Sequence, residues 1–242
     1  LRAFYYTCGA AMLLAALTLS RMPVQARPAG AKGFSLSDAA ATLSTAARSR
    51  RFRSFFGCIM FFYLSWHVDW SLWFIAQTQY CGMSELNMSV LNALCCVTQL
   101  LTIGWFARLN QKRGVGFSLL FGIGGLMLCP LTVCLCLALP HAARPPVFIV
   151  LVTLLYAPQS CINLCVVQML LSAVPERGRS LIVSLYTIVV TLSNSLMPLL
   201  GVQLYTWLGA SAQALLAINL CVSLWRATAL CIFALRWRRQ RA

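Results

Sequence analysis

Long apolar runs alternate with shorter polar segments along the whole chain. A helix that crosses the hydrocarbon core of a bilayer needs about 20 predominantly apolar residues. The pattern therefore predicts an all-α polytopic membrane protein with seven transmembrane helices. The predicted spans cover residues 3–20, 55–77, 90–109, 115–139, 147–173, 181–204 and 212–235.

The amino-acid composition points the same way and changes how the charge is interpreted. The chain is 60% hydrophobic and 10% charged, with a mean hydropathy of +0.80, whereas soluble domains are about 25% charged. Its formal net charge is +15, which in a soluble protein would suggest binding to nucleic acid. Because the basic residues here lie between apolar runs, they indicate cytoplasmic loops instead, and no nucleic-acid partner is expected.

The basic residues gather in every second connection between the predicted spans and in the C-terminal tail. They are Arg21, Arg27, Lys32, Arg48, Arg50, Arg51, Arg53, Arg108, Lys112, Arg113, Arg177, Arg179, Arg236, Arg238, Arg239 and Arg241. The other connections contain only Arg144, and the N-terminal end contains Arg2. Because basic loops remain cytoplasmic, we predict an outside N-terminus and a cytoplasmic C-terminus in a bacterial plasma (inner) membrane.

The spans divide the chain into three segments: a transmembrane helix at residues 1–20, a cytoplasmic basic linker at residues 21–54, and a six-helix transmembrane domain with a basic tail at residues 55–242. The first run also has the small residues of a signal peptide, but it lacks an A-x-A cleavage site. Within the linker, Ser35 and Asp38 follow the capping-box pattern. We predict a short amphipathic helix over residues 37–48 at the cytoplasmic surface; the alternative is a solvated linker.

The cysteines and acidic residues limit the chemistry that the chain could perform. Ten of the twelve cysteines lie inside apolar runs, where a free thiol packs as a small hydrophobe: Cys58, Cys95, Cys96, Cys129, Cys134, Cys136, Cys161, Cys165, Cys221 and Cys231. No CxxC pair is followed by a second pair or by histidines, so no metal site is predicted. The predicted spans offer one acid and one histidine, whereas a membrane hydrolase or transferase needs paired acids, a histidine cluster or an activated nucleophile. We expect neither an enzyme nor a cofactor.

Two segments carry a family resemblance, and the first is "GWFARLNQKRGVGFSLLFG". Gly104, Lys112 and Arg113 occupy positions of the pattern G-x-x-x-D-R-x-G-R-R. Arg108 replaces the aspartate of that pattern, and Gln111 replaces its inner glycine. The segment resembles the cytoplasmic turn that joins helices two and three in each half of a major facilitator superfamily transporter. The resemblance implies a cytoplasmic gate loop at Gly104, Arg108, Lys112 and Arg113, without its acidic partner.

The second segment is "VPERGRSLIVSLYTIVVTLSNSLMPLLGVQLYTWLG", which resembles the same family at Pro175, Glu176, Arg177, Arg179, Ser180, Tyr186, Pro198 and Gly201. The resemblance implies a secondary active transporter that moves a small solute by alternating access. Residues 1–20 would be helix six of twelve, and the last six spans would form the carboxyl-terminal half, built from two inverted three-helix repeats. The missing amino-terminal half would then be a partner, and the chain would be truncated.

The run "FFYLSWHVDWSLWFIAQTQY" places His67 and Asp69 inside a predicted span. A charge in a bilayer costs about 2.5–3.5 kcal/mol on insertion scales, so it usually faces a pore, a solute or a partner. Residues two apart on a helix point about 200° apart, so the two side chains do not share a face. We expect the Asp69 face to line the solute path, together with Ser65, Trp66, Trp73 and Gln77.

Other polar residues recur at helical spacing in two later spans. They are Tyr156, Gln159 and Asn163 in the fifth span, and Thr191 and Asn194 in the sixth. Polar side chains also hold helices together in lipid, so each residue alone has this second interpretation. The resemblance implies that both sets face one cavity.

The role of Asp69 itself has two interpretations. A carboxylate in partly dry surroundings can exchange protons near neutral pH, so Asp69 is a proton-site candidate. Alternatively, Asp69 ties two helices together, for example by pairing with Arg226 of the last span. We expect His67 to be a neutral packing residue.

Two other functions fit a chain of this topology. A receptor-like protein of the rhodopsin type also has seven spans and an outside N-terminus, but the last span has no lysine for retinal, and the Asp-Arg-Tyr motif is absent. A non-transporting membrane subunit would have no polar cavity face and would bind no solute.

Overall fold

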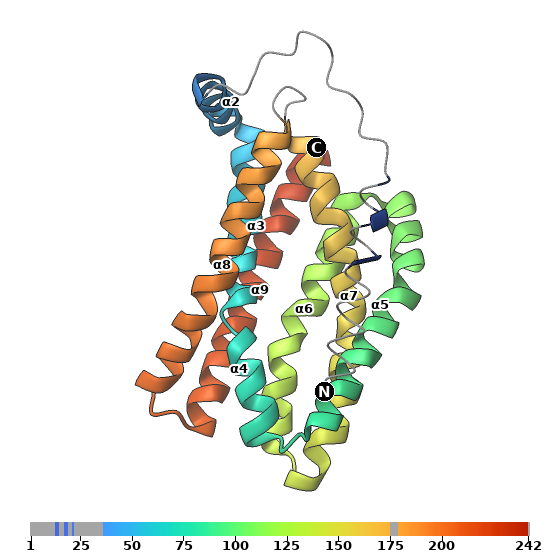
Figure 1. Ribbon diagram of the computed structural model, residues 1–242, viewed down its shortest axis with the longest axis vertical. Helices are drawn as coiled ribbons and strands as arrows, with labels where there is room; N and C mark the ends of the chain where they lie inside the picture. Colours follow the sequence, from blue (N-terminus) through green and yellow to red (C-terminus); the bar gives the residue numbers. More distant parts are fainter. Residues whose placement is uncertain (1–12, 15–16, 19–20, 22–35, 175–178, 242) are drawn as a thin grey trace. The chain divides into compact units, whose positions relative to one another are not determined.

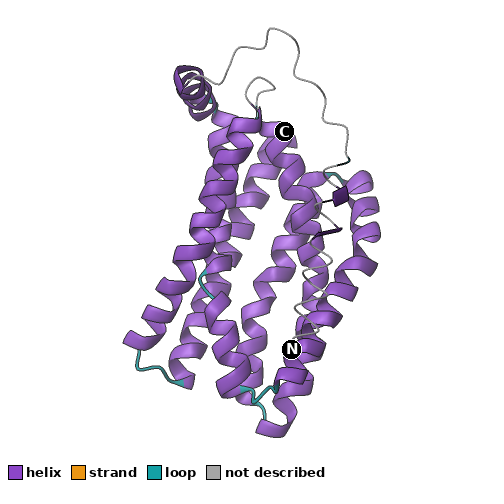
Figure 2. Cartoon of the chain, viewed as in Figure 1, coloured by secondary structure: helices purple, strands orange, loops and turns teal. Residues whose placement is uncertain are grey.

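The computed structural model describes residues 13–14, 17–18, 21, 36–174 and 179–241, and the predicted span over residues 3–20 lies mostly outside them. The chain divides into two units, Leu1–Leu36 and Ser37–Ala242, and the second unit contains the long helices. All of its elements are helical in the described part (Figures 1 and 2). They are α2 (Leu36–Arg48), α3 (Arg50–His67), α4 (Trp70–Ile75), the π-helix η1 (Ala76–Tyr80), α5 (Glu85–Arg113), α6 (Val115–Ala138), the short 3₁₀ helix η2 (His141–Ala143), α7 (Arg144–Ala173), α8 (Arg179–Trp207) and α9 (Ala212–Arg241).

Five of these helical segments are long and apolar enough to cross a membrane. They are Glu85–Arg113, Val115–Ala138, His141–Ala173, Arg179–Trp207 and Ala212–Arg239. Each has the length that the hydrocarbon core requires. These candidate spans suggest an integral membrane protein, as the sequence predicts. α2 covers the segment for which a short helix was expected.

The prediction of one continuous helix over residues 55–77 is wrong. α3 ends at His67, and α4 begins at Trp70. Aspartate competes with the backbone for hydrogen bonds and is therefore a poor residue for a helix interior. Gly201 of α8 packs directly on this break, because a Cβ atom at Gly201 would overlap the Val68 carbonyl oxygen.

The helices alternate in direction, so that basic residues collect at one end of the described bundle. α3, α6 and α8 begin at this end, and α5, α7 and α9 finish there (Figure 1). Its described basic residues are Arg48, Arg50, Arg51, Arg53, Arg108, Lys112, Arg113, Arg179, Arg236, Arg238, Arg239 and Arg241. At the opposite end, among described residues, only Arg144 is a lysine or arginine.

Glycines allow α6 to pack closely against its neighbours. A Cβ atom at Gly122 would overlap the Ile162 side chain of α7, and one at Gly125 would overlap the Pro158 ring. Small residues permit such close approach between membrane helices. α6 therefore packs closely against α7 at both glycines.

The predicted gate loop is helical rather than a loop. α5 continues through Arg113, so Gly104, Arg108 and Lys112 are helical residues, and the turn into α6 is Gly114 alone. Gly114 has φ 86°, a conformation that favours glycine. Basic residues in the last turn also complement the helix dipole, which explains why α5 extends beyond the predicted boundary.

Candidate functional site

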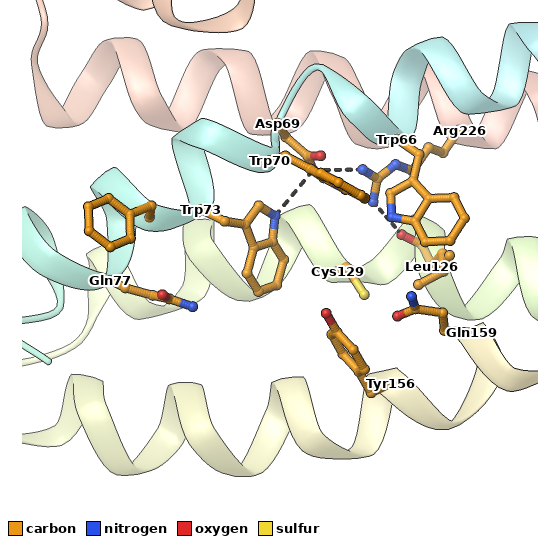
Figure 3. A pocket seen from close by; sticks show the side chains of 11 residues that line it. Trp66, Asp69, Trp70, Trp73, Gln77, Leu126, Cys129, Tyr156, Gln159 and Arg226 are labelled. Atoms are coloured by element: carbon orange, nitrogen blue, oxygen red, sulfur yellow. Dashed lines mark hydrogen bonds and ion pairs between the residues drawn. The ribbon is translucent and has the colours of Figure 1, made fainter. Parts of the chain in front are cut away.

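A pocket of about 320 Å³ lies between the broken helix α3–α4–η1 and helices α6, α7 and α9 (Figure 3). Its lining combines aromatic rings with a few polar groups. The lining residues are Trp66, Asp69, Trp70, Trp73, Phe74, Gln77, Leu126, Cys129, Tyr156, Gln159 and Arg226. Binding sites for small molecules typically have this combination of apolar walls and few polar groups.

The break between α3 and α4 positions the acidic side chain of the pocket. Asp69 lies between the two helices, and its Oδ2 accepts a hydrogen bond of 3.2 Å from the Trp73 indole N–H one turn later. The Asp69 side chain is buried. A charge in this position requires a partner, because an isolated ion in an apolar interior is strongly unfavourable.

Arg226 of α9 supplies that partner. Its Nη2 lies 2.7 Å from Asp69 Oδ2 and also donates to the Ser65 carbonyl at 3.2 Å. Its Nη1 donates to the Leu126 carbonyl of α6 at 2.8 Å. One buried guanidinium thus connects α9 with α6 and with the broken helix, and it neutralises the charge of Asp69.

Pro130 explains why the Leu126 carbonyl is available. In a continuous helix this carbonyl would accept from the N–H of the residue four positions later, but that residue is Pro130, which has no N–H. The Met127 carbonyl next to it accepts from Ser223 Oγ of α9 at 2.9 Å. The proline therefore creates the acceptor to which Arg226 binds.

Two polar atoms of the ion pair remain without a partner among the described residues. They are Asp69 Oδ1 and Arg226 Nε, and both are buried. An unsatisfied buried polar group costs about 1–3 kcal/mol. The pocket wall therefore contains an acceptor and a donor that are not saturated by the protein.

The aromatic lining forms broad apolar walls beside this pair. Trp73 packs edge-on against Phe148, with ring centroids 5.3 Å apart, and Trp66 packs against Phe62 at 5.7 Å. Gln77, Gln159 and Tyr156 add neutral hydrogen-bonding groups to the lining. The site can therefore stack a flat apolar ring and hydrogen-bond to its edge.

His67 packs on the other side of the break. Its Nδ1 lies 2.9 Å from Ser193 Oγ of α8, and its ring stacks on Tyr63 at 5.4 Å. It is buried and is not part of the pocket lining. These contacts belong to helix packing between α3 and α8.

Six residues expected on the solute path line this pocket: Trp66, Asp69, Trp73, Gln77, Tyr156 and Gln159. The other four lie elsewhere. Ser65 is buried, and its hydroxyl donates to the Phe62 carbonyl at 2.6 Å. Asn163 is exposed and lines a separate hollow between α5 and α7, because it lies two turns beyond Tyr156 along α7. Thr191 and Asn194 are exposed on α8, whose described residues do not line this pocket.

Sequence reasoning did not place several lining residues in the cavity. Trp70 and Phe74 line the pocket although neither belongs to the helical face that was assigned to Asp69. Leu126 and Cys129 are ordinary apolar residues of α6 and gave no signal. Arg226 could be recognised from the sequence, because a lone arginine inside an apolar span needs a hydrogen-bond acceptor.

Comparison with known proteins gives no match: no family model fits the chain, and neither a curated protein nor a solved structure is similar to it. What the described residues establish is an all-helical protein with five long apolar helices. A proposal about its function therefore has to be argued from the geometry of the pocket and from the helix packing.

Proposed function

We propose that this chain is the carboxyl-terminal part of a secondary active transporter of the major facilitator type, and that its aromatic pocket binds the transported solute. The observation that carries the proposal is a helix, α3–α4, that breaks at a buried ion pair beside that pocket. Broken helices with polar groups at the break are typical of solute sites in transporters.

The proposed fold includes an inverted repeat. If α3–α4, α5 and α6 are exchanged for α7, α8 and α9, three contacting pairs correspond to three others, whereas the α7–α8 contact has no comparable counterpart between α5 and α3–α4. Thus α5–α7 corresponds to α8–α3, α6–α7 to α9–α3, and α5–α6 to α8–α9. The exchanged helices run in opposite directions, as a pseudo-two-fold axis in the membrane plane requires.

The chemistry of the lining favours a particular class of solute. Asp69 and Arg226 neutralise each other, so the pocket does not select a net charge. Its tryptophans offer flat surfaces, and Gln77 and Gln159 offer both donors and acceptors. We infer a small solute without net charge that has a flat ring and several hydrogen-bonding groups at its edge.

Asp69 remains the proposed proton site. Protonation of its carboxylate would weaken the ion pair to Arg226, which connects three parts of the bundle. A proton taken up at Asp69 would therefore loosen α9 from the broken helix. Such a change is what coupling between proton movement and alternating access requires.

The proposed partner is an amino-terminal half, which would close the pocket from the other side. Thr187, Thr191 and Asn194 form an exposed polar stripe on α8. Polar side chains in a membrane helix usually face another helix or a water-filled path. In the proposed transporter this stripe faces the path between the two halves, and the basic end of the bundle is cytoplasmic.

Ligand binding to the purified chain in lipid nanodiscs tests the proposal. The probes are nucleosides, aromatic amino acids and monosaccharides, and the readout is tryptophan fluorescence. We expect saturable quenching by ring-containing solutes, which Trp73→Phe reduces and the matched change Trp207→Phe at the end of α8 does not. The proposal fails if every probe leaves the fluorescence of the unmodified chain unchanged, or if quenching is insensitive to Trp73→Phe.

A further inference from the structure

A second pocket, of about 560 Å³, lies between α3 and α9 at the basic end of the bundle. The two helices pack against each other, and α3 begins at the end where α9 finishes (Figure 1). Half of the lining residues are arginines, and none of those that the structure describes is acidic. The lining residues are Arg50, Arg51, Ser54, Cys58, Ile232, Leu235, Arg236 and Arg239.

Neither acidic side chain that the structure describes is available to these arginines. Asp69 forms its ion pair with Arg226 in the other pocket. Glu85 begins α5, at the opposite end of the bundle. Four like charges around one pocket repel one another, and in a low-dielectric setting this repulsion is poorly screened. The pocket is therefore suited to an anion that comes from outside the described part of the chain.

Arg236 is the arginine of this pocket whose position is best defined. Its Cζ lies 5.5 Å from the centroid of the Phe55 ring, a cation–π contact, and its Nη2 donates to the Arg51 carbonyl at 3.5 Å. Its Nη1 is buried and has no hydrogen-bond partner among the described residues. The charge of Arg236 is thus fixed at the pocket wall, with hydrogen-bonding capacity that the described residues do not use.

The lining changes from charged to apolar in the same direction on both helices. On α3 it changes from Arg50 and Arg51 at the helix start to Cys58, about two turns deeper. On α9 it changes from Arg239 near the helix end to Ile232, also about two turns deeper. A phospholipid has the same order, with its phosphate at the membrane surface and its acyl chains below. A soluble anion would use only the charged part of this pocket.

We propose that this pocket binds an anionic phospholipid, with the phosphate among the arginines and an acyl chain along the apolar residues. Basic pockets between membrane helices bind anionic headgroups, and the guanidinium fork matches the geometry of a phosphate. The candidate span of α9 ends at Arg239, so the arginines lie at headgroup depth. The inference requires that α9 crosses a membrane, and it does not depend on solute transport. The bound lipid would neutralise the arginines and hold α3 against α9.

Native mass spectrometry of the chain in detergent, titrated with phosphatidylglycerol, tests this site. We expect saturable binding to the unmodified chain. The double variant Arg50→Gln/Arg239→Gln should bind about 30-fold more weakly, because two attractions to the phosphate are lost. The control Arg108→Gln/Lys112→Gln removes the same charge from exposed positions at the same end that do not line the pocket. It should leave the affinity unchanged, and equal weakening by both double variants would overturn the proposal.

Three further arms separate this lipid from other occupants. Equal affinity for phosphatidylcholine would show that acyl chains alone fill the pocket, and displacement of the lipid by millimolar inorganic phosphate would show a site for soluble phosphate. Either result overturns the proposal. Ser54→Glu adds a carboxylate at an exposed lining position, and it should weaken phosphatidylglycerol binding while the lipid-free melting temperature stays the same. If the arginine double variant does not fold, Ser54→Glu decides, and unchanged binding contradicts the proposed site.

Discussion

The Arg226 guanidinium donates hydrogen bonds to three acceptors: the Asp69 carboxylate and the Ser65 carbonyl of the broken helix, and the Leu126 carbonyl of α6. In a packed membrane interior, the loss of either charge leaves the other without compensation. The pair is therefore both a structural link and the polar wall of the pocket.

A double-mutant cycle tests this interdependence. Asp69→Leu or Arg226→Met alone should lower the free energy of unfolding by about 3–5 kcal/mol, since each leaves a buried charge unpaired. The combined change should cost much less than the sum of the two. Thermal unfolding in detergent measures all three. Additive losses would show that Asp69 and Arg226 act separately.

At this scale, the pocket gathers six of the ten residues that the sequence placed on the solute path. Asp69 and its aromatic neighbours could be predicted because a charge inside an apolar span needs a specific environment. Arg226 was equally conspicuous, yet its pairing with Asp69 stayed one alternative, because spacing along one helix does not reveal which helices are neighbours. Asn163 lies outside this pocket, because a helical stripe gives direction but not depth along the axis.

The interruption of α3 at Val68 and Asp69 is the feature of the elements that matters most for the site. Trp70 and Phe74 follow it and line the pocket, and the Ser65 carbonyl before it accepts a hydrogen bond from Arg226. Hydrophobic periodicity could not reveal it, because the surrounding residues are apolar on both sides of the break. The helix types and most boundaries of α6 to α9 could be predicted from the apolar runs alone.

Gly201 of α8 should be essential to this interruption. An added methyl group would overlap the Val68 carbonyl oxygen, and overpacking of this kind costs about 1–3 kcal/mol. Gly104→Ala is the matched control, because a Cβ atom there has no neighbour within 4 Å and alanine favours a helix over glycine by about 0.5–1 kcal/mol. Unfolding midpoints should fall for Gly201→Ala and stay equal or rise for Gly104→Ala. Equal behaviour of the two variants would argue against close packing at the break.

Over the whole molecule, the charge distribution and the alternating helix directions agree. The arginines and lysines of α3, α5, α8 and α9 meet at one end of the described bundle, which is the cytoplasmic end in the proposed orientation. This agreement could be predicted from the sequence, because it depends only on the order of runs and charges. The packing of α6 between α7 and α9 could not, because it depends on contacts between distant glycines and prolines.

Labelling of single engineered cysteines by a membrane-impermeant maleimide checks this orientation in intact cells. Ala142→Cys, beside Arg144, should be labelled from outside. Gln111→Cys, in the basic end of α5, should react only after the membrane is permeabilised. Both positions are exposed, so access and not burial decides the result. The reverse pattern would refute the proposed orientation.

The central claim is that the pocket beside Asp69 is a water-accessible solute path, and cysteine accessibility within the membrane tests it most directly. In a folded variant whose native cysteines are replaced by alanine, Gln77→Cys and Gln159→Cys line the pocket. Leu224→Cys is the control, because it lies near Arg226 on α9 but is exposed on the outer surface. Thiols react as thiolates, which need water. We predict that a charged methanethiosulfonate reagent modifies Gln77→Cys and Gln159→Cys and leaves Leu224→Cys unmodified. If both pocket positions are as inert as Leu224→Cys, the pocket is sealed structural packing and the account is contradicted.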